Sequence, residues 1–539
     1  MKRTVIKQST WGMTVGLFVL ASITLSVPVP AAAGGDTVII MRHDDARMYD
    51  LHKKLSRSTS EPLFMMTDTL VAIEDDLKTI RPSLVKSWTI SPDGWTYTFK
   101  LCEDVIFYSG KPMTAEDVEY TFKRWLSPET NSPSVGRAGP MKEVRAIDKY
   151  TVEITLEKPF AGFLPQLAVA YAGITNKESV ERFGKDFGLK GLDGTGPFRW
   201  EKWIPRDQII LRRHDAYRWG PPMFDNSGPA HVERIIWKVI PEDTARVASL
   251  LSGQGDISYN IPLSAVQQLR AASNISIVEP RAFGWIAYIG FRIDRELVSD
   301  PRVRRAMWLA VDRDTMMKTL WFNEAAPAHA FCPPTTPGYD KSIDSKLVRY
   351  NPAKASQLLE EAGWKIGGDG FRYKDGKKLA PILYGQDDPF WRSRMEAVQG
   401  YLRTVGVDLQ LKLWEPTLGS AKIQSGEGHE MWALFGAYGS VAELLGNYFS
   451  PGQRMCAYLA KPDEEVVALM RAGASAETPE KSFANYAKAL NLIHDRSYWL
   501  PLAYEKMLVS YNNRRVTGVN RHGINGCGLY KGLDIKIVK

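Results

Sequence analysis

The chain has 539 residues and a formal net charge of +8 at pH 7. This length predicts about three domains, each with a hydrophobic core of its own. The charge excess is small for a chain of this size, and acidic and basic residues are mixed along the sequence without a basic run. We therefore expect a solvated surface and exclude a nucleic-acid-binding groove.

The N-terminal segment has the layout of a secretory signal peptide. Three basic residues lie within the first seven positions, residues 11–28 carry no charge, and residues 31–33 are all alanine. The most apolar part, Val15–Ala21, is shorter than the ~20 residues that a membrane-spanning helix needs. We expect export with cleavage after Ala33 and a periplasmic mature protein, with an uncleaved membrane anchor as the alternative. No later segment is long and apolar enough to span a bilayer.

Four cysteines occur in the chain: Cys102, Cys332, Cys456 and Cys527. In an oxidising compartment they could form one or two disulfides, and the sequence does not choose among the three full pairings. Cys102 directly follows an alternating strand and could equally be a packed thiol. No C-x-x-C motif occurs, so neither a redox motif nor a zinc site is predicted.

A turn, a strand and a helix can be read from the segment after residue 90. Ser91-Pro92-Asp93-Gly94 is a turn, because proline presets φ and glycine supplies the positive-φ position. Apolar residues alternate with polar ones from Trp95 to Leu101, which predicts a half-buried strand. Thr114 then opens a T-x-x-D capping pattern, and the apolar positions from Val118 to Leu126 have helical spacing.

The rest of the chain alternates strands with capped helices. The alternation predicts strands at 152–156, 198–203, 208–212 and 235–239, of which the middle two form a hairpin. Three helices begin with a capping residue followed by proline at the first helical position, where the missing N–H costs nothing. These pairs are Asp300-Pro301, Asn351-Pro352 and Thr478-Pro479, and a fourth helix is expected from Met395 to Val405. The pattern is typical of a mixed α/β protein.

The usual catalytic signatures are absent from the sequence. It contains no P-loop, no H-E-x-x-H, no G-x-S-x-G and no EF-hand loop, and no histidine stands four residues from another. Two acidic clusters, Glu74–Asp76 and Asp387-Asp388, could do acid–base work. Adjacent carboxylates on a loop more often lie at the protein surface, exposed to solvent. We therefore predict no catalytic residues, no metal site and no cofactor.

Aromatic residues in glycine-rich surroundings are the best candidates for a binding site. Rings and a carboxylate beside glycine-rich turns suit the wall of a ligand cleft. The competing interpretation for each residue is ordinary core or loop packing. The candidate ligand-binding residues are Trp285, Tyr288, Trp391, Arg392, Tyr438, Ser440, Glu443 and Tyr448.

Four segments of the chain resemble one protein family. They are RPSLVKSWTISPDGWTYTFKL with FYSGKPMTAEDV, GTGPFRWEKW, DPRVRRAMWLAVDRDTM, and YNPAKASQLLEEAG, in this order. The chain resembles the family 5 extracellular solute-binding proteins of ABC importers, the dipeptide, oligopeptide and nickel-binding group. The similarity covers the chain from about Pro62 to Asn520.

The resemblance implies an α/β fold with two lobes, three domains and a hinge, the type II, cluster C-like fold of periplasmic binding proteins. Lobe one would combine residues 34–75, 194–290 and 501–539. A peripheral domain, residues 76–193, would be inserted in lobe one, and lobe two would span residues 291–500. Two crossing segments, near Tyr288–Arg292 and Pro501–Val509, would form the hinge and let the lobes close on a ligand.

The resemblance also implies a function. The protein would capture a peptide or peptide-like small polar solute in the periplasm and deliver it, as a monomer, to an ABC permease of the inner membrane. Closure of the lobes makes and breaks no bond, so the protein would not be an enzyme. An exported hydrolase that uses Glu443 or Asp387-Asp388 is one alternative, and a chaperone-like or signalling binder is another.

One departure from the family bears on the ligand. Peptide-binding members place an aspartate, which pairs with the amino terminus of the peptide, in a segment resembling GWTGDxxDP. The corresponding stretch here reads GAYGSVAELLGNYF, with Ser440 or a neighbour at the acidic position and Glu443 as the nearby carboxylate. If Glu443 does not replace the aspartate, opines, sugar conjugates, modified peptides or other small polar solutes become more favoured ligands than ordinary peptides. No sequence motif supports binding of a nickel chelate or of haem.

Overall fold

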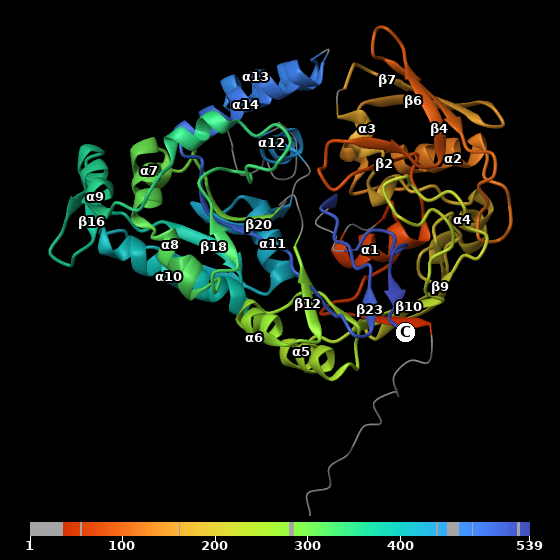
Figure 1. Cartoon of the computed structure of the whole chain (residues 1–539). Coiled ribbons are helices and arrows are strands. Elements are labelled where there is room, and N and C mark those ends of the chain that lie inside the picture. The colour runs from red at the N-terminus through yellow and green to blue at the C-terminus, as the bar shows by residue number, and fades with distance from the viewer. Residues whose placement is uncertain are drawn as a thin grey trace, which may run out of the picture.

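The computed structural model describes residues 36–539 except 54–55, 161, 280–284, 438–439, 450–462, 477 and 525–528. The expected signal peptide, the candidate Tyr438, and the cysteines Cys456 and Cys527 lie outside these residues. Figure 1 shows two halves side by side. One half holds the segments coloured red to yellow together with the C-terminal segment, and the other holds those coloured green to blue.

The first half is organised around a seven-stranded mixed sheet in the order β12-β22-β11-β1-β10-β9-β8. Strand β1 pairs in parallel with β10 and β11, and the other neighbours are antiparallel. The strands are β1 (Thr37–Arg42), β8 (Phe198–Ile204), β9 (Gln208–Arg213), β10 (Arg234–Val239), β11 (Ile257–Ser258), β12 (Ile275–Val278) and β22 (Val509–Asn512). Strand β22 lies between β11 and β12, so the C-terminal part of the chain returns to this half. The helices are α1 (Arg57–Met66), α5 (Asp243–Ser252) and α6 (Val266–Ala271).

A four-stranded antiparallel sheet forms the outer part of this half (Figure 1). It contains β4 (Val85–Ile90), β5 (Thr96–Leu101), β7 (Thr151–Leu156) and β6 (Met141–Asp148), in this order across the sheet. Gly94, in the turn between β4 and β5, has the φ of +74° that the turn requires. Helix α2 (Ala115–Leu126) begins with the predicted capping box of Thr114 and Asp117. The local patterns read from this segment are confirmed.

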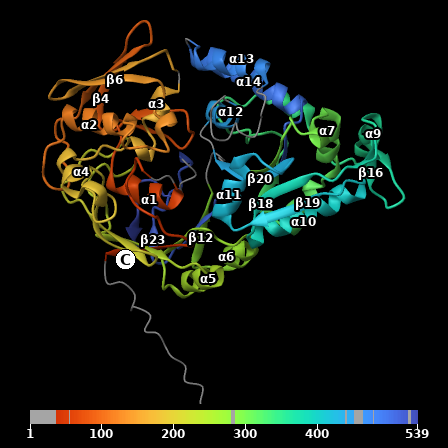
Figure 2. The same ribbon diagram turned by 180° about the vertical axis from the view of Figure 1, so that it is seen from behind.

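The second half contains a six-stranded sheet in the order β14-β21-β13-β20-β18-β19. The strands are β13 (Trp285–Phe291), β14 (Ala325–Pro327), β18 (Ile382–Gln386), β19 (Gln410–Trp414), β20 (Met431–Ala437) and β21 (Trp499–Glu505). Figure 2 shows α12 and α10 on opposite sides of this sheet. Residues of β13 alternate accordingly: Ala287 and Ile289 pack in the core under α10, whereas Ile286 and Tyr288 pack in the core under α12.

Capping residues start most helices of the second half, as the sequence predicts. Asp300, Asn351 and Thr478 each cap a helix whose first residue is proline. Asp388 does the same for α10. The helices are α7 (Pro301–Ala310), α8 (Arg313–Thr319), α9 (Pro352–Glu361), α10 (Pro389–Thr404), α11 (Pro416–Ser425), α12 (Val441–Phe449), α13 (Glu464–Ala474) and α14 (Pro479–Asp495).

Shorter elements complete the fold. Two-stranded pairs are formed by β2 (Val71–Ile73) with β3 (Ile80–Pro82) and by β23 (Val516–Thr517) with β24 (Lys536–Ile537), and a small sheet by β15 (Lys365–Ile366), β16 (Arg372–Lys374) and β17 (Lys377–Lys378). The short helices α3 (Phe163–Gln166) and α4 (Lys177–Phe183) belong to the first half. One continuous hydrophobic core joins the seven-stranded and four-stranded sheets.

Two crossings connect the large sheets. One leads from β12 to β13 and the other from β21 to β22, because each of these pairs has one strand in each sheet. The first crossing therefore lies between Val278 and Trp285, earlier than the expected Tyr288–Arg292, which is inside or just after β13. The second lies between Glu505 and Val509, within the expected segment. The domain boundaries read from the sequence stay a prediction.

Candidate functional site

The strand ends of the second sheet that face the crossings form the candidate site. Strands β18, β19, β20 and β21 run in the same direction, and β13 runs against them. Their carboxyl ends, together with the first residue of β13, therefore lie at one edge of the sheet. Both crossings leave from this edge, and helices α10, α11 and α12 begin beside it. Ligands of open α/β sheets commonly bind at such an edge.

The structure separates the predicted ligand residues into three groups. Trp285, Ser440 and Glu443 are half-buried at this edge. Tyr288 and Tyr448 are buried below it, where the Tyr288 hydroxyl donates to the Tyr448 hydroxyl at 2.6 Å and the Tyr288 ring stacks on Trp499. Their aromatic character, which suggested a cleft wall, is used for packing the core.

The two predicted residues of α10 also have local partners. Trp391 is buried in the core below the sheet, with its ring 4.5 Å from that of Phe435. Arg392 is exposed and pairs with Asp387 at 2.6 Å. These contacts stabilise the start of α10.

Glu443 of α12 connects the two halves of the molecule. Its carboxylate lies 2.6 Å from Nη1 of Arg137, and the two side chains are 14% and 30% exposed. Arg137 ends a short 3-10 helix, Val135–Arg137, between α2 and β6. In this structure the carboxylate that the sequence offered for a ligand cation thus binds a cation of the protein's other half.

A chain of polar contacts fixes the position of Arg137. Its Nη1 also donates to the Tyr171 hydroxyl at 3.0 Å. The carbonyl of Tyr171 accepts a hydrogen bond from Nε2 of the buried His52 at 3.1 Å. Arg124 donates to Nδ1 of His52 and forms a bidentate pair with Asp50. Burial, followed by the charge of Arg124, lowers the pKa of His52 to about 3, so the imidazole is neutral at pH 7.

A second carboxylate, that of Glu505, lies at this edge of the sheet. The sequence did not predict it as a ligand-binding residue. It is the last residue of β21 and the cross-strand partner of Trp285. Trp321 Nε1 donates to its Oε1 at 2.6 Å. Burial raises the pKa of Glu505 to about 7, against opposing effects of the Trp321 hydrogen bond and the Arg394 charge. No sequence motif marks this residue, because its position depends on the pairing of strands far apart in the chain.

The acidic clusters that could have supported hydrolysis have structural roles. Asp388 caps α10 by accepting from the Trp391 N–H at 2.9 Å, and Asp387 pairs with Arg392. In the other cluster, Glu74 pairs with Arg81, and Asp76 accepts from two backbone N–H groups of its own turn.

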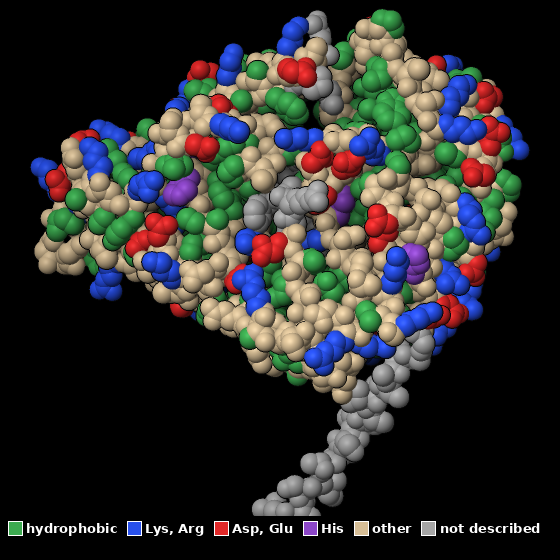
Figure 3. All heavy atoms as spheres, viewed as in Figure 1, with side chains coloured by type: hydrophobic (Ala, Val, Ile, Leu, Met, Phe, Trp, Pro, Cys, Tyr) green, Lys and Arg blue, Asp and Glu red, His purple; other side chains and the backbone are tan. Residues whose placement is uncertain are grey.

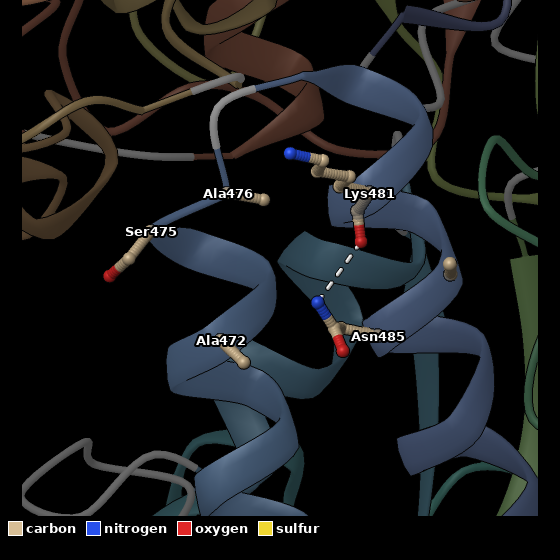
Figure 4. Close-up of a pocket in the computed structure, with 6 residues that line it drawn as sticks. Ala472, Ser475, Ala476, Lys481 and Asn485 are labelled. Atoms are coloured by element: carbon tan, nitrogen blue, oxygen red, sulfur yellow. Dashed lines mark hydrogen bonds between the residues drawn. The ribbon is translucent and has the colours of Figure 1, made fainter.

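A shallow surface pocket lies between α13 and α14, away from the sheet edge. Figure 4 shows Lys481 and Asn485 of α14 opposite Ala472 of α13 and Ala476 just after it, with Asn485 donating to the Lys481 carbonyl. The lining residues are Ala472, Ser475, Ala476, Lys481, Ala484 and Asn485. They include neither an aromatic ring nor a carboxylate, so this pocket offers little to recognise a polar solute.

Cys102 and Cys332 carry free thiols. Cys102 lies in the four-stranded part of the first half and Cys332 is buried in the second half, so the fold keeps them apart. These two cysteines are therefore not paired with each other. Cys456 and Cys527 lie outside the described residues, so the expected one or two disulfides stay a prediction. Among the described residues, no group of three or more His, Cys, Asp or Glu side chains is arranged to hold a metal ion. None of the described helices has the length and apolar character needed to cross a bilayer.

Comparison with known proteins identifies the family. Residues 79–455 match the model of the bacterial extracellular solute-binding proteins, family 5. The chain belongs to this family. It is thus the solute-binding component of an ABC importer, with the two-lobed α/β fold that the family resemblance implied.

Relatives match this chain over nearly its whole length. The glutathione-binding protein GsiB of Salmonella typhimurium is 25% identical over 509 residues, which cover 91% of this chain and 92% of GsiB. The structure of NikA from Brucella suis in complex with Fe(III)-EDTA has a TM-score of 0.83 at 24% identity and covers 93% of this chain and 99% of NikA. AppA from Bacillus subtilis, in complex with a nonapeptide, has a TM-score of 0.77 at 22% identity and covers 94% and 99%. These relatives are binding proteins.

Proposed function

We propose that this protein binds a peptide-like small polar solute between its two halves in the periplasm and delivers it, as a monomer, to an ABC permease of the inner membrane. Family membership supports the transport role. The composition of the N-terminal residues supports export with cleavage of a signal peptide. On the face drawn in Figure 3, acidic and basic side chains are interspersed, which fits a protein that does not bind nucleic acid.

The observation that carries the proposal is the pair of crossings between two large sheets, together with an ion pair that spans the halves. Two short crossings at one edge permit a hinge motion of one half against the other. The Arg137–Glu443 contact can form only when the halves are close together. A solute held between them would be shielded from water, and its polar groups would need partners from the protein.

The solute class follows from the site and from the relatives. The aspartate that peptide-binding members direct at a peptide amino terminus is absent, and Glu443 pairs with Arg137. GsiB, by its name, binds glutathione, a peptide with an unusual γ-linkage. Glutathione and other modified peptides are therefore the first solutes to test, followed by opines, sugar conjugates and metal chelates.

The test is a thermal-shift and small-angle scattering screen of the mature protein. The panel holds reduced glutathione, L-alanyl-L-alanine, octopine, a trisaccharide and a nickel–histidine chelate. A solute at a hundredfold excess over its Kd stabilises the folded state by about 2.7 kcal/mol, which raises the melting temperature. It should also reduce the scattering radius as the halves close.

The outcomes separate transport from hydrolysis. Recovery of the intact solute from the protein after prolonged incubation supports a binding protein, whereas accumulation of a cleavage product supports the hydrolase alternative. A screen in which no solute changes either the melting temperature or the scattering radius contradicts the proposed solute class.

A further inference from the structure

Glu505 and Trp285 form the last cross-strand pair of the β13–β21 ladder, next to both crossings. Residues directly opposite each other in an antiparallel pair place their side chains on the same face of the sheet. Both side chains are half-buried. They therefore lie together where the second half meets the hinge.

The surroundings of this pair suit a cation. The ring of Phe435 lies 6.0 Å from that of Trp285, and Phe390 of α10 lies 4.9 Å from Phe435. Among the residues that the structure describes, none accepts a hydrogen bond from Nε1 of Trp285. A carboxylate beside aromatic faces is the combination that recognises an ammonium group, through an ion pair and cation–π attraction.

The neighbouring arginine does not satisfy Glu505. Arg394 of α10 donates to the carbonyls of Leu320 and Phe390, and its guanidinium lies 3.3 Å from the centroid of the Phe390 ring. No ion pair within 4.0 Å joins it to Glu505 in the described part of the chain. Glu505 keeps one hydrogen bond, from Trp321.

The first half supplies a positive charge beside the second crossing. Arg57 lies in the first turn of α1, and its Nη1 is 3.6 Å from Sδ of Met507, two residues after Glu505 in the second crossing. Its ion pair with Glu61 spans 4.0 Å, the outer limit for such a contact. A half-buried guanidinium in this position can bind a carboxylate through two parallel N–H donors.

We propose that Glu505 and Arg57 bind the zwitterionic end of the solute, with its ammonium at Glu505 beside the Trp285 ring and its carboxylate at Arg57. The inference rests on the proposed function and names the chemistry of the solute more closely. Such a solute carries both charges near one carbon. The γ-glutamyl end of glutathione and the amino-acid moiety of an opine have this arrangement, whereas an ordinary extended peptide separates its two termini.

The test is isothermal titration at pH 8 of the wild-type protein, Glu505→Gln and Arg57→Gln with reduced glutathione, N-acetylglutathione and octopine. Each variant should bind glutathione or octopine at least tenfold more weakly, because one partner of a shielded charge pair is removed. N-acetylglutathione, which lacks the ammonium, should bind the wild type weakly and should not discriminate between the wild type and Glu505→Gln.

Matched controls are Glu296→Gln and Arg145→Gln, which change exposed ion pairs on the outer surface. Both should bind like the wild type. The melting temperature of ligand-free Glu505→Gln at pH 8 should equal or exceed that of the wild type, whereas a purely structural role would lower it.

Three results would overturn the inference. The first is unchanged affinity of both variants for a zwitterionic solute that the wild type binds. The second is binding of only the trisaccharide or the nickel chelate, which would leave the transport function intact. The third is a lack of binding to the whole panel, which would also contradict the proposed solute class.

Discussion

At the residue scale, Glu505 is a carboxyl group whose pKa is raised by burial. Its carboxyl group has a pKa of about 7 in the folded protein and an ordinary value of 4.5. Arg394 of α10 is the charged group that faces it, while Trp321 and Trp285 are its neutral neighbours. Between these two pH values the folded state binds more protons than the unfolded state, so the free energy of unfolding falls as pH rises.

The first prediction concerns this dependence. Relative to Glu505→Gln, which does not titrate, the wild-type protein should lose about 1.4 kcal/mol of stability per pH unit from pH 4.5 to pH 7. Urea denaturation of both proteins at pH 5, 6, 7 and 8 measures the difference. A constant difference across this range would show that Glu505 titrates normally.

His52 is expected to have the opposite dependence. The pKa of the folded state, about 3, lies below the ordinary 6.5, so the unfolded chain binds an additional proton as pH falls between these values. Relative to His52→Gln, the wild type should lose about 1.4 kcal/mol per pH unit on acidification from pH 6 to pH 4. Urea denaturation provides the measurement, and His43→Gln, a change on the surface, is the control. The opposite slope would contradict a buried neutral imidazole.

At the scale of elements, the contact between α12 and the 3-10 helix at Val135–Arg137 is the feature to test. A sheet edge positions α12, and the chain of contacts from Asp50 to Tyr171 positions Arg137. The pair therefore joins two preformed elements. Its contribution is to the closed arrangement of the halves rather than to the fold of either half.

A double-mutant cycle of Arg137→Gln and Glu443→Gln distinguishes closure from direct ligand binding. If the pair holds the halves together, each single variant should weaken binding of glutathione, and the double variant should bind no more weakly than the weaker single one. The coupling energy should be on the order of 1 kcal/mol for a partly exposed ion pair. If Glu443 instead binds a ligand ammonium, its substitution should cost roughly tenfold in affinity whether or not Arg137 is present.

Gly290 illustrates a constraint inside the second sheet. A Cβ atom at this position of β13 would lie 2.1 Å from the Trp432 indole on β20. Gly290→Ala should destabilise the protein by about 1–3 kcal/mol, because the buried indole or the strand must shift. Thermal denaturation measures the loss. Gly400→Ala, on α10 with open space around the added methyl, is the matched control and should be neutral or slightly stabilising.

At the scale of the whole molecule, a cluster of charged residues connects the two halves beside the crossings. Arg270 of α6 forms a bidentate pair with Glu324, just before β14, and also contacts Glu279 after β12. Lys506, after β21, pairs with Glu279 at 2.8 Å. These four residues belong to both halves and to both crossings, so they connect the parts that must move relative to one another.

The Arg270→Met substitution is expected to weaken this connection between the halves. Glu324 is 5% exposed, and removal of its partner leaves a buried charge without compensation. The ligand-free protein should then sample more open arrangements, with a larger scattering radius and weaker binding of glutathione. Arg212→Met, which removes an exposed pair within the first sheet, is the control. An unchanged scattering radius would exclude a role of Arg270 in the balance between open and closed forms.

Local features of this protein were determined by the sequence. Proline after a capping side chain starts α7, α9 and α14, and Ser91–Gly94 makes its turn, because these preferences depend on a few neighbouring residues. The family could also be recognised, since its motifs are contiguous segments. The ligand-binding roles stay predictions: Trp285 and Glu443 lie at the edge of the sheet, whereas Tyr288 and Tyr448 pack in the core.

Only the tertiary structure showed which charges meet. Arg137 and Glu443 are about 300 positions apart in the sequence, and Glu505 lies beside Trp285 only because β13 pairs with β21. Such contacts depend on strand order and on the closure of two halves, for which the residues themselves carry no local signal. The chain thus encodes its elements and its family locally, while the distribution of charge at the candidate site arises from folding.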